Sequence, residues 1–258
     1  MKREEYRLLK PIVETGPETA PHSSPLTPHA VPPGLQALRT SYRALLGEVD
    51  AWFEGCLQAA PPGLLACRKG CSACCRGLFD ITLLDACLLR AGFAQLSEAT
   101  REQVLERCRP RLAELLQRWP QLADPYLLNA LPDDGWTAMP EDDATPCPLL
   151  GDDGLCLIYA NRPMTCRLHG LPNIDLCGEN FSTDVCTLHP GDSHTLPAEV
   201  LRWRFRSTFE REIALLRAFT LQLTGTPTSE ADTFIPLALL ADYGFFVRRE
   251  EWPSENIC

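Results

Sequence analysis

Nine cysteines fall within 120 residues of this 258-residue chain, and four of them occupy only nine positions. Those four lie in the segment ACRKGCSACCRG (66–77), as Cys67, Cys71, Cys74 and Cys75. The other five follow further along the chain: Cys147, Cys156, Cys166, Cys177 and Cys186. A thiolate is a soft donor that binds zinc, copper(I) or iron–sulfur clusters. The pattern therefore predicts a metal centre whose ligands are among these nine side chains.

The spacing within the first group leaves the number of centres open. Cys67, Cys71 and Cys74 are spaced so that three sulfurs converge from one loop. Cys75 is adjacent to Cys74, and neighbouring side chains point apart, so Cys75 serves a second centre, bridges or packs. Nine thiols exceed the four that one zinc ion or one cubane cluster takes. Two four-cysteine sites and one site with several bystander thiols both fit this count.

Other side chains near the cysteines have a supporting role in this interpretation. Five cations lie close to them in the sequence: Arg68, Lys69, Arg76, Arg162 and Arg167. A nearby cation favours the ionised thiol, and we expect Arg162, Arg167 and Lys69 to tune the centre through charge. His169 and His189 each follow a cysteine by three positions. Either could ligate zinc, but the structural, hydrogen-bonded role is favoured for both.

Four cysteines stand outside the nine and are not expected to bind metal. Cys56, Cys87 and Cys108 lie within helical patterns, where a buried cysteine acts as a small hydrophobe. Cys258 is the last residue and is expected to be exposed.

Composition narrows the class of protein and its partners. The chain is long enough to bury a core without disulfides, and clustered cysteines then indicate metal or redox work in a reducing, cytoplasmic setting. No signal peptide is visible, and the longest apolar stretches, 213–223 and 234–246, are short and interrupted by charges, which argues against a membrane partner. A net charge of −10 argues against nucleic-acid binding. The expected partners are a metal ion or cluster and an unidentified protein.

Hydrophobic periodicity predicts a mainly α fold, with helices around an irregular, cysteine-rich metal-binding core. Residues 1–33 hold seven prolines and are expected to form a disordered arm, and 251–258 a tail. Residues 34–250 are expected to form a single helical domain, with the metal core in 64–190. Predicted helices cover 35–60, 79–96 (which begins either as a short extended piece or directly as a helix), 98–118 with Ser97 as N-cap, a short piece near 124–130, 198–225 and about 232–246. Pro110 is expected to kink or split the helix 98–118.

Two separated motifs resemble one known family. The cysteine quartet is followed about 70 residues later by CPLLGDDGLCLIYANRPMTCRLHG (147–170). Together they are similar to the YkgJ-like or CxxCxxCC zinc- or iron-chelating domain. The matching positions of the second block are Cys147, Pro148, Leu150, Gly154, Cys156, Ile158, Tyr159, Arg162, Pro163, Cys166 and Arg167. The resemblance covers about 64–190 and implies metal binding without implying a reaction.

A more distant likeness to the cysteine domain of flagellin lysine N-methylase implies an iron–sulfur cluster and a link to protein modification. The first hypothesis is thus a protein that holds one or more iron–sulfur clusters, 4Fe-4S among the candidates, for electron transfer or modification chemistry. A zinc-stabilised binding module without catalysis and a metal chaperone or store are the alternatives. The Cys67, Cys71 and Cys74 spacing also fits the radical-SAM triplet, but the chain lacks the run of strands that such a barrel needs.

Overall fold

The computed structural model describes residues 33–68, 70–131, 144–182, 186, 188 and 198–241. The predicted arm up to residue 32, the tail, Lys69, His189 and Cys258 lie outside the described residues. The elements run in the order α1 (Pro33–Ala59), β1 (Asp80–Thr82), α2 (Leu83–Phe93), α3 (Glu98–Arg118), η2 (Leu128–Ala130), η4 (Tyr159–Asn161), α4 (Met164–Leu168), β2 (Asn173–Asp175), β3 (Asn180–Ser182), α5 (Ala198–Leu201), β4 (Arg202–Trp203), α6 (Phe205–Thr224), β5 (Asp232–Phe234) and α7 (Ile235–Leu240).

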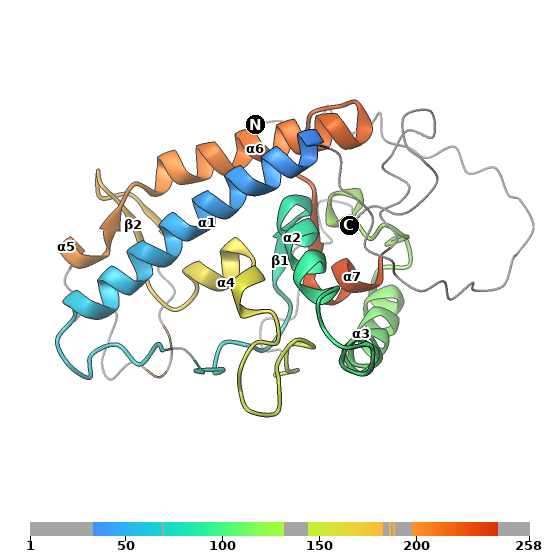
Figure 1. The fold of residues 1–258 in the computed structure, drawn as a ribbon, viewed down its shortest axis with the longest axis horizontal. Coiled ribbons are helices and arrows are strands. Elements are labelled where there is room, and N and C mark those ends of the chain that lie inside the picture. The colour runs from blue at the N-terminus through green and yellow to red at the C-terminus, as the bar shows by residue number, and fades with distance from the viewer. Residues whose placement is uncertain are drawn as a thin grey trace, which may run out of the picture.

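The two longest apolar helical patterns pack against each other. Helices α1 and α6 lie side by side along one edge of the molecule, and α4 lies beneath α1 (Figure 1). The buried face of α1 is built by side chains at helical spacing, namely Tyr42, Leu45, Leu46, Val49 and Trp52. Helix α2 is buried over nearly its whole length, and α7 packs against both α2 and α3. Among the described residues, no helix is long and apolar enough to cross a membrane.

Most of the predicted helices are confirmed, and the mainly α fold with them. The segment 79–96 begins with strand β1 and continues as α2, whose N-cap Thr82 accepts a hydrogen bond from the Asp85 amide. Ser97 caps α3 by accepting from the Thr100 amide. Pro110 lies inside α3 without splitting it. The strands form only two small sheets, β1 with β5 and β3–β2–β4.

The single long helix predicted for 198–225 is wrong at its start. The chain forms α5, then the two-residue strand β4, and only then α6, which ends as predicted at Gly225 with φ 77°. Strand β4 pairs in parallel with β2, and the Trp203 ring stacks on Trp52 with centroids 5.9 Å apart. The Trp52 indole also donates to the Leu201 carbonyl (3.2 Å). These tertiary contacts outweigh the helical propensity of the sequence.

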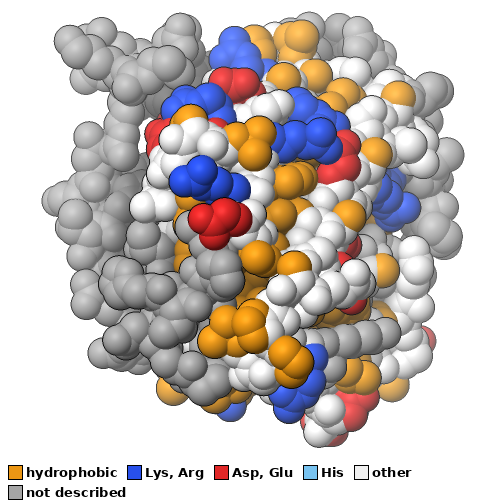
Figure 2. Space-filling view, turned by 90° about the vertical axis from the view of Figure 1, so that its left-hand side faces the viewer, with side chains coloured by type: hydrophobic (Ala, Val, Ile, Leu, Met, Phe, Trp, Pro, Cys, Tyr) orange, Lys and Arg blue, Asp and Glu red, His pale blue; other side chains and the backbone are white. Residues whose placement is uncertain are grey.

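The end of the molecule near α5 and β2 carries charges of both signs. Figure 2 shows Lys or Arg side chains next to Asp or Glu side chains on this face, with apolar side chains between them. Ion pairs join Arg206 to Glu179, and Arg204 and Arg211 to Glu48. Among the described residues of this face, positive and negative side chains therefore alternate and pair with one another.

A buried hydrogen-bond network joins α1, α2 and α6 inside the core. The Tyr42 hydroxyl oxygen lies 2.8 Å from Oδ1 of Asp85 and 2.8 Å from Oε1 of Glu212. A hydroxyl has one proton to donate, so one of the two carboxyls must be protonated to complete both bonds. Burial, followed by the negative charge of Asp85, raises the pKa of Glu212 to about 8. Glu212 is therefore the carboxyl that keeps its proton at neutral pH.

This network predicts that stability falls as the pH rises. The folded chain keeps the Glu212 proton up to about pH 8, whereas the unfolded chain releases it near the usual glutamate value. Stabilisation is thus complete at acidic pH and is lost as the pH rises towards 8, with a slope of at most about 1.4 kcal/mol per pH unit between pH 6 and 8. Glu212→Gln should flatten this slope in urea unfolding. An unchanged slope would mean that Glu212 is ionised in the folded protein. Burial raises the pKa values of Asp85 and Asp232 to about 6, so these two groups titrate at the acidic end of this window, and the effect of Glu212→Gln is read above about pH 7.

Candidate metal centre

Backbone hydrogen bonds hold the two cysteine blocks together although about 70 residues separate them. The amide of Cys147 donates to the carbonyl of Cys75 (2.9 Å), and that of Gly77 donates to the carbonyl of Thr145 (2.8 Å). Within the first block, the amide of Cys75 closes a turn onto the carbonyl of Ser72 (3.0 Å). The quartet and the start of the second block therefore form one local unit that is set by the main chain.

The second block folds back on itself before it enters α4. The amide of Gly151 donates to the Leu155 carbonyl (2.8 Å), and an isolated antiparallel bridge joins Leu150 to Cys156. Gly154, with φ 77°, supplies the left-handed residue that this tight turn requires. The chain then passes through η4 and Pro163 into α4, which carries Cys166. This path brings Cys147, Cys156 and Cys166 to one place.

Six cysteines from both blocks line one small cavity of about 80 Å³. They are Cys71, Cys74, Cys75, Cys147, Cys156 and Cys166. We call this space the inner thiol cavity. Apolar side chains complete its wall, among them Phe79, Leu149 and Ile235. Its lining thus combines sulfur donors with a largely apolar surface.

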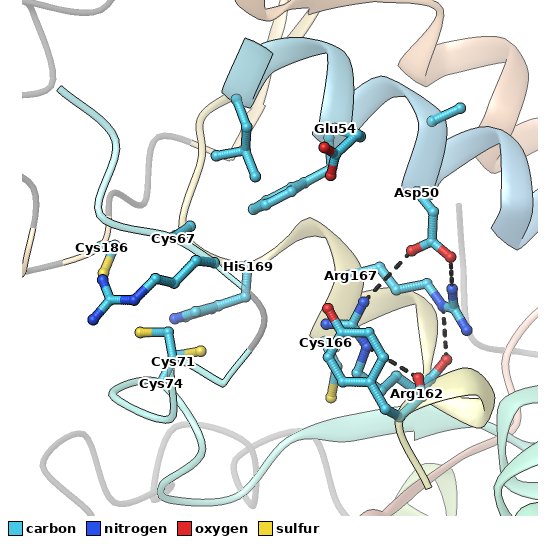
Figure 3. A pocket seen from close by; sticks show the side chains of 16 residues that line it. Asp50, Glu54, Cys67, Cys71, Cys74, Arg162, Cys166, Arg167, His169 and Cys186 are labelled. Carbon is cyan, nitrogen blue, oxygen red and sulfur yellow. Dashed lines mark hydrogen bonds and ion pairs between the residues drawn. The ribbon is translucent and has the colours of Figure 1, made fainter. Parts of the chain in front are cut away.

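A larger cavity of about 520 Å³ lies next to the inner one and shares Cys71, Cys74 and Cys166 with it. Cys67, Cys186 and the two cations Arg162 and Arg167 also line it. We call it the outer thiol cavity. Figure 3 shows the sulfurs of Cys71 and Cys74 near the imidazole of His169, with Cys67 and Cys186 on the same side of the cavity. His169 lines both cavities, and its ring meets Phe79 edge-on, with centroids 5.3 Å apart.

The pKa shifts divide the thiols into two neighbourhoods. Around the inner cavity, the charges of Cys147, Cys166 and Cys156 all act on Cys75, and those of Cys147 and Cys156 act on Cys166. Around the outer cavity, the charges of Cys186, Cys71 and Cys74 act on Cys67. The Cys74–Cys75 pair connects the two groups through a side-chain hydrogen bond, which raises the pKa of Cys74 and lowers that of Cys75.

Burial is the main cause of the raised pKa values of most of these thiols. It raises the pKa of Cys147 to about 11 and that of Cys67 to about 12, and it holds the pKa of Cys166 well above its usual value. The Arg162 guanidinium opposes this effect by favouring the thiolates of Cys156 and Cys166. A bound metal cation would act in the same direction, and more strongly, because thiols lose their protons when they ligate a metal.

The two predicted arginines occupy different positions at the site. The Arg162 guanidinium stacks on the Tyr159 ring, 3.8 Å from its centroid, and lies 3.5 Å from Asp50. The Arg167 side chain is only 4% exposed; it pairs with Asp50 and donates to the carbonyls of Arg162 and Ala160 (2.9 Å each). Arg167 therefore joins α4 to α1, while Arg162 is the arginine whose charge acts on the thiols. Arg68 and Arg76 donate to nearby carbonyls and are exposed.

Not every predicted ligand joins these cavities. Cys177 lies exposed in the turn between β2 and β3, where its thiol donates to Oδ2 of Asp175 (3.3 Å). Cys56, Cys87 and Cys108 are buried in helices, as predicted for bystanders. Within the described part of the chain, no three Cys, His, Asp or Glu side chains already form a coordination sphere. The donor set suits zinc or iron, so ligation would require the cysteine side chains to turn towards a common point.

Two residues at the site were missed by the sequence analysis. Asp50 is 117 positions from its partner Arg167 and sits in a helix without any motif, so no sequence signal marks it. Gly170 has φ +101°, and a Cβ built there would lie 3.1 Å from Sγ of Cys67 and 3.6 Å from Cβ of Cys186. Only a glycine lets the chain pass this close to both cysteines.

Gly170→Ala should therefore disturb the outer thiol cavity. The left-handed backbone alone costs about 1–2 kcal/mol for alanine, and crowding of Cys67 adds to it. Gly178→Ala is the matched control, because φ there is +90° but the nearest atom to a new Cβ, Nη2 of Arg202, is 3.8 Å away. Urea unfolding should show a larger loss for Gly170→Ala than for Gly178→Ala. Equal losses of unfolding free energy in the two variants would show that the Cys67 side chain moves away from the new Cβ without destabilising the protein.

One comparison with known proteins gives a match, and it falls on the cysteine-bearing segment. The sequence pattern of the CxxCxxCC family, described as "Putative zinc- or iron-chelating domain", matches residues 66–187. No curated protein and no solved structure matches the chain. The matched segment begins just before Cys67 and ends just after Cys186, so it spans all nine predicted ligands. Residues 66–187 thus match the CxxCxxCC family of zinc- or iron-chelating domains, the family that the two cysteine motifs resemble.

Proposed function

We propose that this protein holds an iron–sulfur cluster in the inner thiol cavity and uses it in electron transfer or protein modification. The observation that carries the proposal is the convergence of six thiols from two distant blocks on one small, largely apolar cavity. The primary ligand set we propose is Cys75, Cys147, Cys156 and Cys166, whose charges act on one another.

The remaining thiols support a second centre in the outer thiol cavity. Cys67, Cys71, Cys74 and Cys186 form another set of four, and the charges of the last three all act on Cys67. The adjacent pair Cys74 and Cys75 would then be divided between two centres. A total of eight thiolates exceeds the need of one zinc ion, which favours cluster chemistry or two ions. Cys177 is left out of both sets because of its exposed position.

Burial and charge around the inner set suit a redox centre. Cluster potentials depend on solvent exposure and on nearby charge. Burial raises the pKa of the Cys166 thiol. The Arg162 guanidinium acts in the opposite direction and favours ionised thiols at Cys156 and Cys166. When bound, a cluster would supply one-electron chemistry, and the role of the chain would be to ligate it, shield it from water and adjust its potential.

A zinc-stabilised binding module is the second candidate, and the irregular segment 144–182 favours it. This segment has only short elements, η4, α4, β2 and β3. Closed four-thiolate zinc sites stabilise such segments without catalysis. The proposed setting for either candidate is the cytoplasm, because none of the described cysteines is in a disulfide bond.

Metal, sulfide and absorption measurements after anaerobic purification test the proposal. We expect iron and acid-labile sulfide, with visible absorption that dithionite bleaches. Stoichiometric zinc in a colourless, air-stable protein would replace the cluster proposal with the zinc module. Exchangeable metal above a fixed ratio would indicate a chaperone or store.

Single substitutions test the ligand set. Cys156→Ser and Cys166→Ser should each lower bound metal at least about tenfold, since each removes a proposed ligand. Cys177→Ser is the exposed control and Cys108→Ser the buried one, and both should retain the metal content of the natural chain. Retention of metal by Cys166→Ser, or its loss from Cys177→Ser, would contradict the proposed set.

A further inference from the structure

A third cavity, of about 350 Å³, lies on the other side of His169 and Gly170 from the thiols. Four carboxyl groups line it: Asp80 and Asp85 from β1 and α2, Glu212 from α6 and Asp232 from β5. We call it the acidic cavity. Among the described residues that line it there is no Lys or Arg. Its wall therefore has a strong excess of groups that can carry negative charge.

The neighbouring arginines are already engaged elsewhere. Arg167 acts on Asp85 through its charge, but its guanidinium pairs with Asp50 and with two carbonyls. Arg206 lies 5.9 Å from the Phe181 ring centroid and pairs with Glu179. Buried carboxylates are costly unless a positive partner offsets them. The cavity thus lacks a counter-charge of its own among the described lining residues, apart from what His169 can provide.

Asn173 gives a second, independent indication of a ligand. This residue of β2 lines the acidic cavity and is 6% exposed, yet Oδ1 of its side chain has no hydrogen-bond partner. Buried amide groups are normally satisfied, because leaving one unpaired costs about 1–3 kcal/mol. A carbonyl oxygen of this kind accepts from an N–H donor. Among the described residues, the cavity wall therefore lacks a hydrogen-bond donor for Asn173. The carboxyl groups of the same wall are also acceptors when they are ionised, so they too favour a ligand that donates.

The rest of the lining indicates an organic ligand more than a metal ion. The apolar side chains of Ile81, Met164 and Leu168 and the rings of Phe181 and Phe209 supply surface for an alkyl chain. Phe181 and Phe209 meet edge-on, with centroids 5.1 Å apart. Within the described residues, the carboxylates are not arranged in a group of three that would hold an ion. The volume falls in the range of small-molecule sites.

We propose that the acidic cavity binds the ammonium group of a small organic amine, with Glu212, Asp85 and Asp232 as counter-charges and Asn173 as an uncharged acceptor. Oδ1 of Asp85 already accepts from Tyr42 and from the Met164 amide (3.0 Å), so Glu212, with its single contact to Tyr42, has more capacity left than Asp85 to bind a ligand. Arrival of a cation would favour ionised Glu212. The bound amine would lie beside His169, which also lines both thiol cavities.

Calorimetric titration of the protein as purified, with its metal, tests this inference at pH 7.5. The probes are butylammonium chloride and butan-1-ol, which have the same alkyl chain and differ in charge. We expect saturable one-to-one binding of butylammonium and binding of butan-1-ol at least about thirtyfold weaker. Equal binding of both would show an apolar pocket only, and displacement of butylammonium by Mg²⁺ or Ca²⁺ in equimolar amounts would show a metal site. Either result overturns the inference.

Two variants on the same helix locate the binding. Glu212→Gln keeps a hydrogen bond to Tyr42 but removes the charge, and it should weaken butylammonium binding at least about tenfold. Glu210→Gln is the matched control, because Glu210 is exposed on α6 and does not line the cavity; its affinity should stay within about twofold of the natural chain. Asp232→Asn is the second test of the charge should Glu212→Gln fold poorly. Unchanged affinity in both cavity variants would contradict the proposed site. The metal content is measured separately, so failure here leaves the cluster proposal intact.

Discussion

Replacing Asp50 with alanine should lower the free energy of unfolding by about 2–4 kcal/mol. Asp50 is the ion-pair partner of Arg167, whose side chain is 4% exposed, so the substitution leaves a buried guanidinium without its directly paired carboxylate. Loss of one partner from a fully buried pair costs about 3–5 kcal/mol. The expected value is somewhat lower because the Asp50 side chain is 45% exposed and the pair is partly screened by solvent. Urea unfolding of the metal-loaded protein measures the difference.

Glu48→Ala provides the matched control on the same helix. Glu48 also pairs with arginines, Arg204 and Arg211, but their side chains are 52% and 45% exposed. Exposed pairs contribute at most about 1 kcal/mol, so this control should change little. Asp50→Asn should recover part of the loss by keeping a hydrogen-bond acceptor for Arg167. Equal effects of Asp50→Ala and Glu48→Ala would show that burial of Arg167 does not matter for stability.

The Asp50–Arg167 pair has a consequence for the metal-binding region. Arg167 also donates to the carbonyls of Ala160 and Arg162, so one side chain fixes η4 and α4 against α1. Helix α4 carries Cys166, which lines both thiol cavities. Loss of Asp50 should therefore speed the release of bound metal as well as lower stability. Metal transfer to a chromogenic chelator, followed over time, would report this coupling.

Local sequence signals predicted much of the fold because the relevant interactions are local. Ser97 caps its own helix, Gly225 ends one, and the apolar spacing from Leu35 to Trp52 sets the buried face of α1. The cysteine motifs predicted a zinc- or iron-chelating family over about 64–190, and the family comparison, which matches residues 66–187, confirms this. The helical cysteines Cys56, Cys87 and Cys108 are buried, as their positions in helical patterns indicated.

Features that depend on contacts between distant segments could not be predicted in this way. The break between α5 and α6 depends on the stacking of Trp203 on Trp52 and on pairing with β2. The acidic cavity depends on four carboxyl groups that come from β1, α2, α6 and β5. The different environments of Cys177 and Cys166 arise from turn and helix positions that thiol spacing alone does not distinguish. In each case, contacts with residues far away in the sequence determine the local structure or the environment of the side chain.

Removal of the bound metal is expected to have the largest effect on the segment 144–182. This segment has few regular elements, and its ties to the first cysteine block include only a few backbone hydrogen bonds, such as that from Cys147 to Cys75. A ligand present at about a thousand times its dissociation constant stabilises the folded state by about 4 kcal/mol. For a chain of this size, that corresponds to a fall of about 8–16 °C in Tm on chelation. Calorimetry under anaerobic, reducing conditions measures it.

Hydrogen exchange shows where that stability resides. Amides of 144–182 should exchange faster after chelation, whereas α1 and α6 should stay protected because Leu45, Val49 and Phe219 pack in the main hydrophobic core. Cys166→Ser should reproduce this pattern without a chelator, and Cys177→Ser should not. Faster exchange spread evenly over the chain would mean that the metal supports the whole fold, and no change would remove the structural role altogether. A change confined to 144–182 would instead mean that the apolar core folds by packing and that the metal orders the cysteine segment attached to it.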